Sequence, residues 1–421
     1  MTSTEHRSAR LRRAASSVVI TGRGIGFLVA GILSFIAAPA LALPAMLYVT
    51  GLLLGLVILS AVFVFVGHSK VRIERAFSPQ VVPPGTLSRA TVHVTNLSVL
   101  PCLEARWEDH LPHGISGDSE GTLPALGGSH SAESRVTFSY TLQGLQRGRH
   151  QIGPLRIDVQ DPFGLVYRRH SFGAAVPLTV LPRRVELAPI TARGASDDGA
   201  TVPAPQNVGV GDDDIIARTY LPGDALKRIH WKATAHRAEL MVRQEEQQIT
   251  PRATVVLDTE PTSQGTARDR KDAWEYSPTF EWAVVAAASI MSHLARSGYV
   301  VTVQSSGRAI DRVVADGHDT IEDAMVDLAV VEPEPDDHPG RFEADRAAFV
   351  VLGRLTVGRA QHWVTALAAS RTILAFVARG TSGDALDVLD AARWKVVSYG
   401  PGDDLAEMWT HFDGVTARAA S

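Results

Sequence analysis

The sequence predicts two N-terminal transmembrane helices, then an antiparallel β-sandwich domain, then an α/β doubly wound domain. No charged residue occurs between Arg23 and Lys70. Residues 71–187 contain short alternating segments separated by turn signals, and from residue 253 apolar strand-like runs alternate with helical segments. We therefore divide the chain into a basic tail (1–23), a helical hairpin (24–67), a β-sandwich (70–190), a linker with a motif segment (191–252) and an α/β domain (253–421).

The apolar N-terminal run is predicted to form two helices, residues 24–41 and 45–66, joined by a tight turn. A bilayer core needs roughly 20 apolar residues per helix, and both segments are close to that length. Pro39 and Pro44 interrupt the run near its middle. Because a helix does not easily continue through two closely spaced prolines, a hairpin is expected rather than one long helix.

Basic residues flank this hairpin on both outer ends. They are Arg7, Arg10, Arg12, Arg13 and Arg23 before it and Lys70, Arg72 and Arg75 after it. Basic residues near the ends of spans favour the cytoplasmic side, so we expect a multi-pass inner-membrane protein with a cytoplasmic soluble body. The alternative is a secretory signal, which Ala40-Leu41-Ala42 and Arg12-Arg13 would suit. The second apolar run argues against that alternative, since cleavage would still leave a membrane helix.

Composition limits the remaining possibilities. The net charge of −4 offers no general attraction to nucleic acid. The single cysteine, Cys102, excludes both an internal disulfide framework and a cysteine-rich zinc site.

Residues 71–187 are predicted to form an antiparallel sandwich, because short strands recur there without a helical period. Turn signals such as Pro83-Pro84-Gly85 and Gly153-Pro154 separate the strands. No titratable cluster is expected in this domain, which favours a spacer or an interaction module. The clearest expected strands are residues 89–95, 135–140, 150–159 and 176–181.

Residues 253–421 alternate between strand and helix, which predicts a parallel sheet covered by helices on both faces. Ser277 and Pro278 are typical of the start of a helix, and Gly298 is typical of its end. The expected strands are 254–257, 299–303, 348–352, 372–377 and 395–398; the expected helices are 280–294, 321–330, 359–369, 385–392 and 405–411.

Between the two domains lies a basic segment that also contains aromatic residues. Its Leu221-Pro222-Gly223-Asp224 run suits a type II turn. Such a turn could hold phosphate or a carboxylate-bearing partner. In the alternative interpretation, Arg218 pairs with Asp224 and Trp231 fills the core of the α/β domain. The cations are Arg218, Lys227, Arg228, Lys232, Arg237 and Arg243, interleaved with Tyr220, His230 and Trp231.

This segment resembles the signature of a bacterial family catalogued as domain of unknown function fifty-eight. The residues that carry the resemblance are Arg218, Tyr220, Pro222, Gly223, Asp224, Ile229, His230 and Trp231, with further matches at Arg147-Gly148-Arg149-His150, Ile152-Gly153-Pro154, Asp161-Pro162-Phe163-Gly164-Leu165 and Leu181-Pro182-Arg183. The resemblance implies a membrane protein that works beside a MoxR-type AAA+ ATPase and a transglutaminase-like membrane protein. It also implies a C-terminal part similar to von Willebrand factor A domains. No enzymatic activity is attached to the family.

A von Willebrand factor A domain binds Mg²⁺ through an Asp-x-Ser-x-Ser loop after its first strand. The matching residues here are Asp258, Glu260 and Thr262. Glu260 stands where the family pattern has serine. The alternative to a Mg²⁺ site is therefore a loop that no longer binds metal and is capped by its own carboxylates. We therefore expect no cofactor, and Mg²⁺ is the one that the resemblance would allow, since hard oxygen donors suit it. No Walker-type motif is present, so ATP hydrolysis by this chain is not expected.

The function that follows is a membrane-anchored, cytoplasm-facing protein-interaction module. With a MoxR-type AAA+ ATPase it would serve the assembly or maturation of protein complexes. The lack of a catalytic set favours this role over an enzyme. Two alternatives stay open: a metal-assisted hydrolase using Asp258, Glu260 and His230, and a purely structural membrane scaffold.

Overall fold

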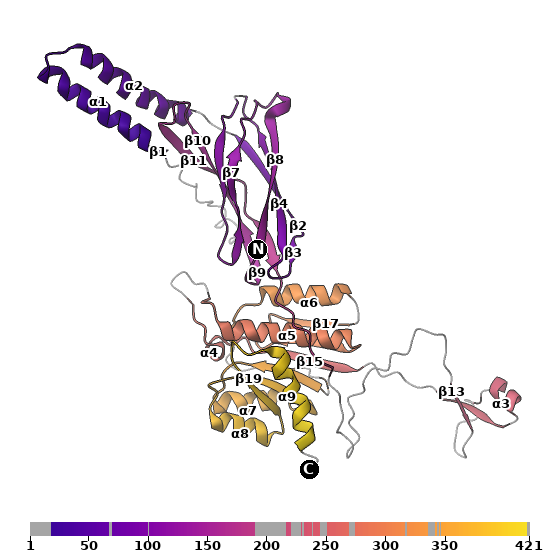
Figure 1. The fold of residues 1–421 in the computed structure, drawn as a ribbon. Coiled ribbons are helices and arrows are strands. Elements are labelled where there is room, and N and C mark those ends of the chain that lie inside the picture. The colour runs from indigo at the N-terminus through magenta and orange to yellow at the C-terminus, as the bar shows by residue number, and fades with distance from the viewer. Residues whose placement is uncertain are drawn as a thin grey trace, which may run out of the picture. The chain divides into compact units, whose positions relative to one another are not determined.

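The structure is a computed structural model of the 421-residue chain (Figure 1). It forms two compact units, Met1–Arg183 and Arg184–Ser421, and each is described by itself. The described residues are 18–66, 70–99, 101–189, 216–219, 229, 231–237, 239–244, 251–268, 274–315, 318–335, 342, 345 and 347–418.

The first unit begins with the helical hairpin, α1 (Gly22–Ala40) and α2 (Ala45–Val66). The prediction of two helices is confirmed, although α1 begins two residues earlier than expected and includes Pro39 in its last turn. Thr21 caps α1, because its hydroxyl oxygen accepts a hydrogen bond from the Gly24 amide at 3.1 Å. Both helices are long and apolar enough to cross a membrane, judged by length and composition.

The rest of the first unit is the expected β-sandwich. One sheet has the order β1-β11-β10-β5-β7, a second β2-β4-β8-β6 and a third β3-β12-β9, and all neighbours are antiparallel except β3 and β12. The strands are β1 (Val18–Ile20), β2 (Val71–Ser78), β3 (Val81–Val82), β4 (Leu87–Asn96), β5 (Ala105–Asp109), β6 (Ile115–Gly117), β7 (Glu120–Leu123), β8 (Arg135–Gly144), β9 (Gly148–Ile152), β10 (Leu155–Gln160), β11 (Val166–Phe172) and β12 (Val176–Val180).

The prediction of one strand over residues 150–159 is wrong. The chain forms β9 and β10 instead, in two different sheets: β9 pairs with β12, and β10 pairs with β5 and β11. Gly153 separates them with φ +105°, a conformation that residues with a Cβ rarely adopt. Pro154 then has no amide hydrogen to donate to a ladder.

A buried ion pair crosses between two sheets of the sandwich. Arg75 of β2 donates to both carboxylate oxygens of Asp109 of β5, the shortest distance being 2.7 Å, and both side chains are almost fully buried. The Tyr140 hydroxyl also donates to Asp109. Burial and the Asp109 charge raise the pKa of Tyr140, so its hydroxyl stays protonated and available as a donor. We interpret this group as structural, because each charged atom already has a protein partner.

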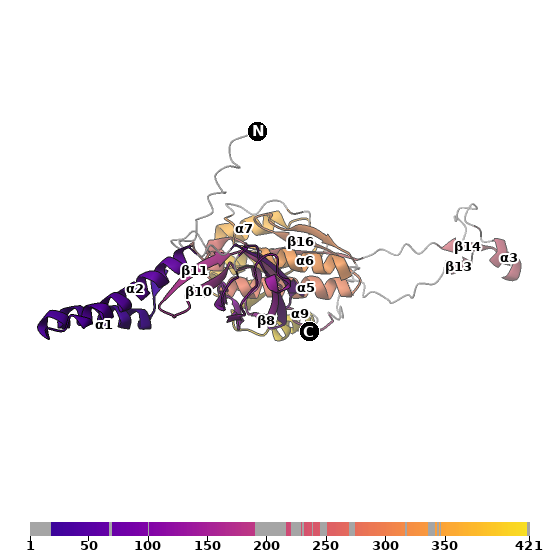
Figure 2. The ribbon, with the colours of Figure 1, turned by 90° about the horizontal axis from the view of Figure 1, so that it is seen from above.

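The turn between β10 and β11 attaches the sandwich to the helical hairpin. Asp161 is buried, and its carboxylate accepts four hydrogen bonds: from the Ser60 hydroxyl of α2 at 2.9 Å and from three amides of its own turn, those of Phe163, Leu165 and Val166, at 2.6–2.8 Å. Burial opposes ionisation of Asp161, but these hydrogen bonds outweigh it and hold its pKa below the usual range. The carboxylate therefore stays charged and fixes the turn against α2. The ribbons of β10 and β11 lie beside one end of α2 in both views (Figures 1 and 2).

The other helix of the hairpin contacts the same turn. The Thr21 hydroxyl donates to the carbonyl oxygens of Gly164 and Leu165 at 2.7 and 3.0 Å, and the Thr21 amide donates to Leu165. A Cβ at Gly24 would lie 2.3 Å from the Leu165 carbonyl oxygen, so only glycine fits there. Strand β1, which the sequence did not predict, continues this contact by pairing with β11.

The second unit contains a six-stranded sheet in the order β17-β16-β15-β18-β19-β20. The predicted parallel sheet is confirmed, whereas the antiparallel edge strand β17 was not predicted. The side chains of α7 and α8 pack on one face of the sheet, while Trp282 of α5 and Trp409 of α9 contact strand residues of the other face. The strands are β15 (Arg252–Leu257), β16 (Val300–Ser305), β17 (Asp311–Val314), β18 (Ala347–Leu352), β19 (Thr372–Ala378) and β20 (Lys395–Tyr399), and the helices are α4 (Pro261–Gln264), α5 (Pro278–Arg296), α6 (His318–Val330), α7 (Val357–Ala366), α8 (Gly383–Ala391) and α9 (Leu405–Arg418).

Residues 185–188 already contact the α/β domain, although the sequence analysis placed them in the sandwich domain. The Val185 amide donates to the Ser289 hydroxyl at 3.0 Å, and the Trp409 indole donates to the Ala188 carbonyl at 2.8 Å. These residues, predicted as the end of the sandwich domain, therefore pack against α5 and α9.

Candidate functional site

Asp258 lies directly after β15, at the point where the strand order of the sheet reverses. From β15 the chain moves to β16 on one side and later returns to β18 on the other. In doubly wound folds, ligands bind at the carboxyl ends of the strands at such a point. This is where the sequence predicts the metal residues Asp258, Glu260 and Thr262.

The Asp258 carboxylate is fully buried and already held by protein groups. One oxygen accepts from the Arg359 guanidinium of α7 at 2.9 Å. The other accepts from the Ser263 hydroxyl at 2.7 Å and from the Gly353 amide at 3.1 Å. Arg359 is 14% exposed, so a positive charge closes the carboxylate from its outer side.

Of the other two predicted metal residues, Glu260 is half-buried and Thr262 is exposed. The Thr262 hydroxyl donates to the Glu260 carboxylate at 3.0 Å. Mg²⁺ needs carboxylate oxygens that are free to coordinate and keeps several waters around it. The donor set here does not fit that requirement, because a guanidinium stands against Asp258. Across the described residues, no group of three or more His, Cys, Asp or Glu side chains could hold a metal ion. The Mg²⁺ site stays a prediction from the family resemblance, without support from this geometry.

The family-type motif lies mostly outside the described residues. Five of its residues lie outside the described part of the chain: Tyr220, Pro222, Gly223, Asp224 and His230. The structure therefore does not test a site made by His230 and Asp258. The described parts include β13 (Ile216–Thr219), α3 (Trp231–Arg237) and β14 (Met241–Gln244), and the motif residue Ile229, which is buried and forms an isolated bridge with Val242.

Two motif residues are placed on these elements. Arg218 lies in β13 opposite Val242 of the antiparallel β14. Trp231 begins α3 with its side chain 68% exposed, so the alternative in which Trp231 fills the core of the α/β domain is wrong. An exposed tryptophan of this kind is typical of binding surfaces.

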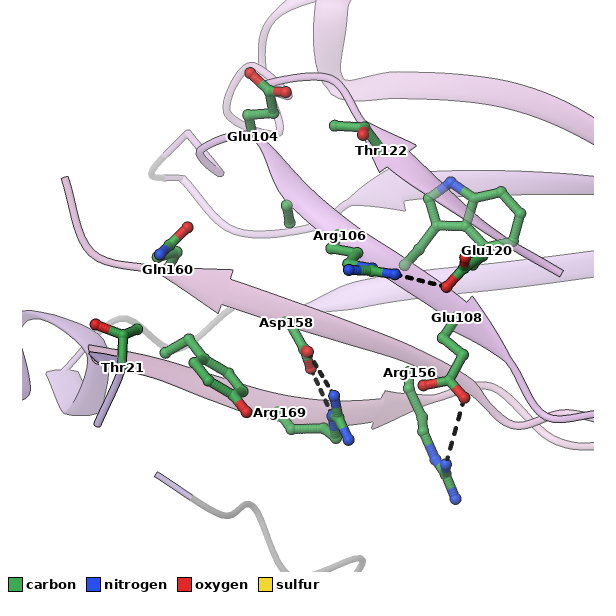
Figure 3. Close-up of a pocket in the computed structure, with 13 residues that line it drawn as sticks. Thr21, Glu104, Arg106, Glu108, Glu120, Thr122, Arg156, Asp158, Gln160 and Arg169 are labelled. Atoms are coloured by element: carbon green, nitrogen blue, oxygen red, sulfur yellow. Dashed lines mark hydrogen bonds and ion pairs between the residues drawn. The ribbon is translucent and has the colours of Figure 1, made fainter. Parts of the chain in front are cut away.

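A polar groove of about 810 Å³ lies on the outer face of the sandwich sheet that contains β5, β7, β10 and β11 (Figure 3). Its chemistry comes from three arginine–carboxylate pairs. Arg169 bonds Asp158 through two parallel hydrogen bonds of 2.7 Å, Arg106 bonds Glu120 at 2.6 Å, and Arg156 lies 3.9 Å from Glu108. Thr21, just before α1, also lines the groove.

The sequence-based expectation of no titratable cluster in the sandwich is wrong. The signal was present in the chain, because Arg106 and Glu108 alternate along β5, with Glu104 just before it, and therefore project from one face. The partners of Arg106 and Glu108 come from β7 and β10, and the neighbouring Arg169 and Asp158 from β11 and β10. The sheet topology needed to bring them together is not visible in a linear pattern.

The ion pairs of the groove are suited to exchange. All three are partly exposed, and because water screens ion pairs of this kind, they add little to the stability of the fold. A partner with complementary charges can therefore replace them at small cost. The groove thus presents both charge signs on one surface, which is chemistry suited to a charged peptide or protein surface.

Comparison with known proteins supports the family resemblance. Residues 216–375 match the family model described as protein of unknown function DUF58. The uncharacterized protein YeaD of Bacillus subtilis (strain 168) is 23% identical over 259 residues, which cover 61% of this chain and 60% of that protein. The chain thus aligns with somewhat less than two thirds of the length of this relative.

Two of the similar solved structures each match about a quarter of the chain. The CARDB domain of a Pyrococcus furiosus protein, in complex with di-metal ions, is 18% identical and covers 27% of this chain and 93% of its own, with a TM-score of 0.20. The GAE domain of GGA2p from Saccharomyces cerevisiae is 14% identical and covers 26% of this chain and 91% of its own, with a TM-score of 0.18. At these scores we carry over no property of either protein.

Proposed function

We propose that this chain is a membrane-anchored protein-interaction module; residues 216–375 match a family model whose function is unknown, so the proposal rests on the structure. The observation that carries the proposal is the exposure of the hairpin. Only 17% and 22% of the apolar windows of α1 and α2 are buried, whereas the core helix of a soluble protein buries most of its apolar surface. Leu52, in the middle of α2, is 69% exposed.

The soluble body lies on the cytoplasmic side in this proposal. The support is the distribution of basic residues, with five arginines before the hairpin and Lys70, Arg72 and Arg75 after it. An even number of spans returns the chain to the side from which it started.

The groove with its three ion pairs is the partner-binding surface of the proposal. The groove exposes both arginine and carboxylate side chains, so a complementary partner carries both negative and positive side chains. Charged pairs of this kind contribute specificity and speed of association more than affinity. The exposed Trp231 supplies a second contact of the type that dominates binding energy.

We propose a MoxR-type AAA+ ATPase as the partner, together with a transglutaminase-like membrane protein, and the assembly or maturation of protein complexes as the process. The support is the family resemblance. The hydrolase alternative loses support from Asp258, which is buried and held by Arg359.

The test is capture of the ATPase by the full-length chain in native membranes, with and without nucleotide. Arg156→Glu reverses one charge of the groove, and Arg312→Glu is a matched control in an exposed ion pair of the α/β domain. We expect the wild-type chain and the control to retain the ATPase and Arg156→Glu to lose most of it. Failure of the wild-type chain to capture any AAA+ protein, or equal capture by both variants, would contradict the proposal.

A further inference from the structure

The turn between β10 and β11 contacts the helical hairpin near the helix ends. If the hairpin spans a membrane, these ends lie at the boundary of the lipid. Helix α2 has 22 residues, so it is about 33 Å long, while the hydrocarbon core is about 30 Å thick. Nearly the whole helix is therefore needed to cross. Ser60 precedes Val66 by six residues, or about 9 Å along the axis, which places its hydrogen bond to Asp161 within the outer part of that span.

Helix α1 leads to the same depth. It has 19 residues, or about 29 Å, so its first turn is also needed to cross. Thr21, immediately before that turn, donates to the carbonyl oxygens of Gly164 and Leu165. Val57 of α2, with Leu165 and Val166, forms a small buried apolar cluster between the turn and the helices. The turn thus contacts both helices where each enters the membrane.

The chemistry of the turn suits this location. A carboxylate near hydrocarbon is costly unless the protein satisfies it, and Asp161 accepts four protein hydrogen bonds. Phe163, at the tip, is the large apolar residue that the turn leaves exposed, at 52%. The Arg168 guanidinium lies 5.3 Å from the Phe65 ring centroid and bonds the Phe65 carbonyl, near the end of α2, where lipid headgroups are expected.

We propose that the turn Asp161-Pro162-Phe163-Gly164-Leu165 is a membrane-contact site that inserts Phe163 into the lipid interface. This inference rests on the proposed anchoring of the chain and adds to it a second point of contact, made by the sandwich itself. An aromatic ring at the lipid interface stabilises the orientation of the sandwich in which the ring reaches the boundary between headgroups and acyl chains. The sandwich is thereby fixed against the bilayer.

The test measures depth with spin labels on the full chain in vesicles of phosphatidylcholine and phosphatidylglycerol. In a Cys102→Ser background, single cysteines replace Phe163, Leu145 and Leu52. Leu145 is a matched control, because it is 57% exposed and lies just after β8, at the end of the sandwich away from the hairpin. Leu52 reports on the hairpin alone. The measured quantity is the ratio of collision rates with oxygen, which enters lipid, and with a water-soluble nickel complex.

We expect a several-fold higher oxygen-to-nickel ratio at position 163 than at position 145, and the highest ratio at position 52. A ratio at 163 no higher than at 145, or a label at 163 shielded from both reagents, would overturn the membrane-contact site while a lipid-like ratio at 52 still supports anchoring. A nickel-accessible label at 52 would instead overturn the anchoring itself. Near-identical circular dichroism of the three variants confirms that each is folded.

Discussion

Replacing Arg359 by alanine is expected to destabilise the α/β domain strongly. The substitution removes the only cation that bonds the Asp258 carboxylate among the described residues, and leaves this charge fully buried with neutral donors such as the Ser263 hydroxyl. Removing one partner of a buried ion pair costs about 3–5 kcal/mol. Because Arg359 is 14% exposed, we expect the low end of this range, about 3 kcal/mol.

The assay is thermal unfolding of the full chain in detergent, followed by tryptophan fluorescence. Trp363 is fully buried in the core of the α/β domain and reports on it. For a domain of this size, a loss of about 3 kcal/mol lowers the Tm by about 6–12 °C. Arg312→Ala, which breaks an exposed pair with Asp327, is the control, with an expected loss of at most about 1 kcal/mol.

The neutral double variant separates charge from packing. Combining Asp258→Asn with Arg359→Ala removes both charges, so its destabilisation should be smaller than the sum of the two single effects. A Tm decrease for Arg359→Ala no larger than that of Arg312→Ala would refute the reasoning. So would strictly additive effects in the double variant, because the carboxylate and the guanidinium would then not be coupled.

Four other outcomes are expected. Mg²⁺ or a chelator should leave the Tm of the wild-type α/β domain unchanged, since a protein cation already faces the strand-end carboxylate; a clear increase with Mg²⁺ would restore the predicted metal site. Ser60→Ala should destabilise the first unit by about 1.5 kcal/mol, through the loss of a hydrogen bond to a charged group, as a lower Tm would show. Gly24→Val should speed hydrogen exchange in β1 and β11, because its Cβ would lie 2.3 Å from the Leu165 carbonyl oxygen, whereas Gly26→Val has open space and should not. Burial lowers the pKa of His293, so the His293 imidazole binds a proton more tightly in the unfolded chain than in the folded one. The stability of the α/β domain should therefore fall as the pH drops below about 6.5. A His293→Gln variant with the same pH dependence would show that another group is responsible.

Local patterns predicted the elements of this protein well. The run without charges between Arg23 and Lys70 predicted two helices, and the alternation after residue 253 predicted a mostly parallel α/β sheet, although not the order of its strands. These patterns work because a helix or a strand is specified by the residues of its own segment. Gly153-Pro154 is also a local turn signal, and the break between β9 and β10 lies at these two residues.

The sequence by itself determined the apolar hairpin, the two kinds of soluble domain and their order along the chain. Only the tertiary structure decided which polar side chains meet: Arg359 with Asp258, Ser60 with Asp161, and the three ion pairs of the groove. The partners in the first two pairs are separated by about a hundred residues, and no local period relates them. Hydrophobic patterning is a property of each segment, whereas the pairing of polar side chains depends on which segments the fold brings together.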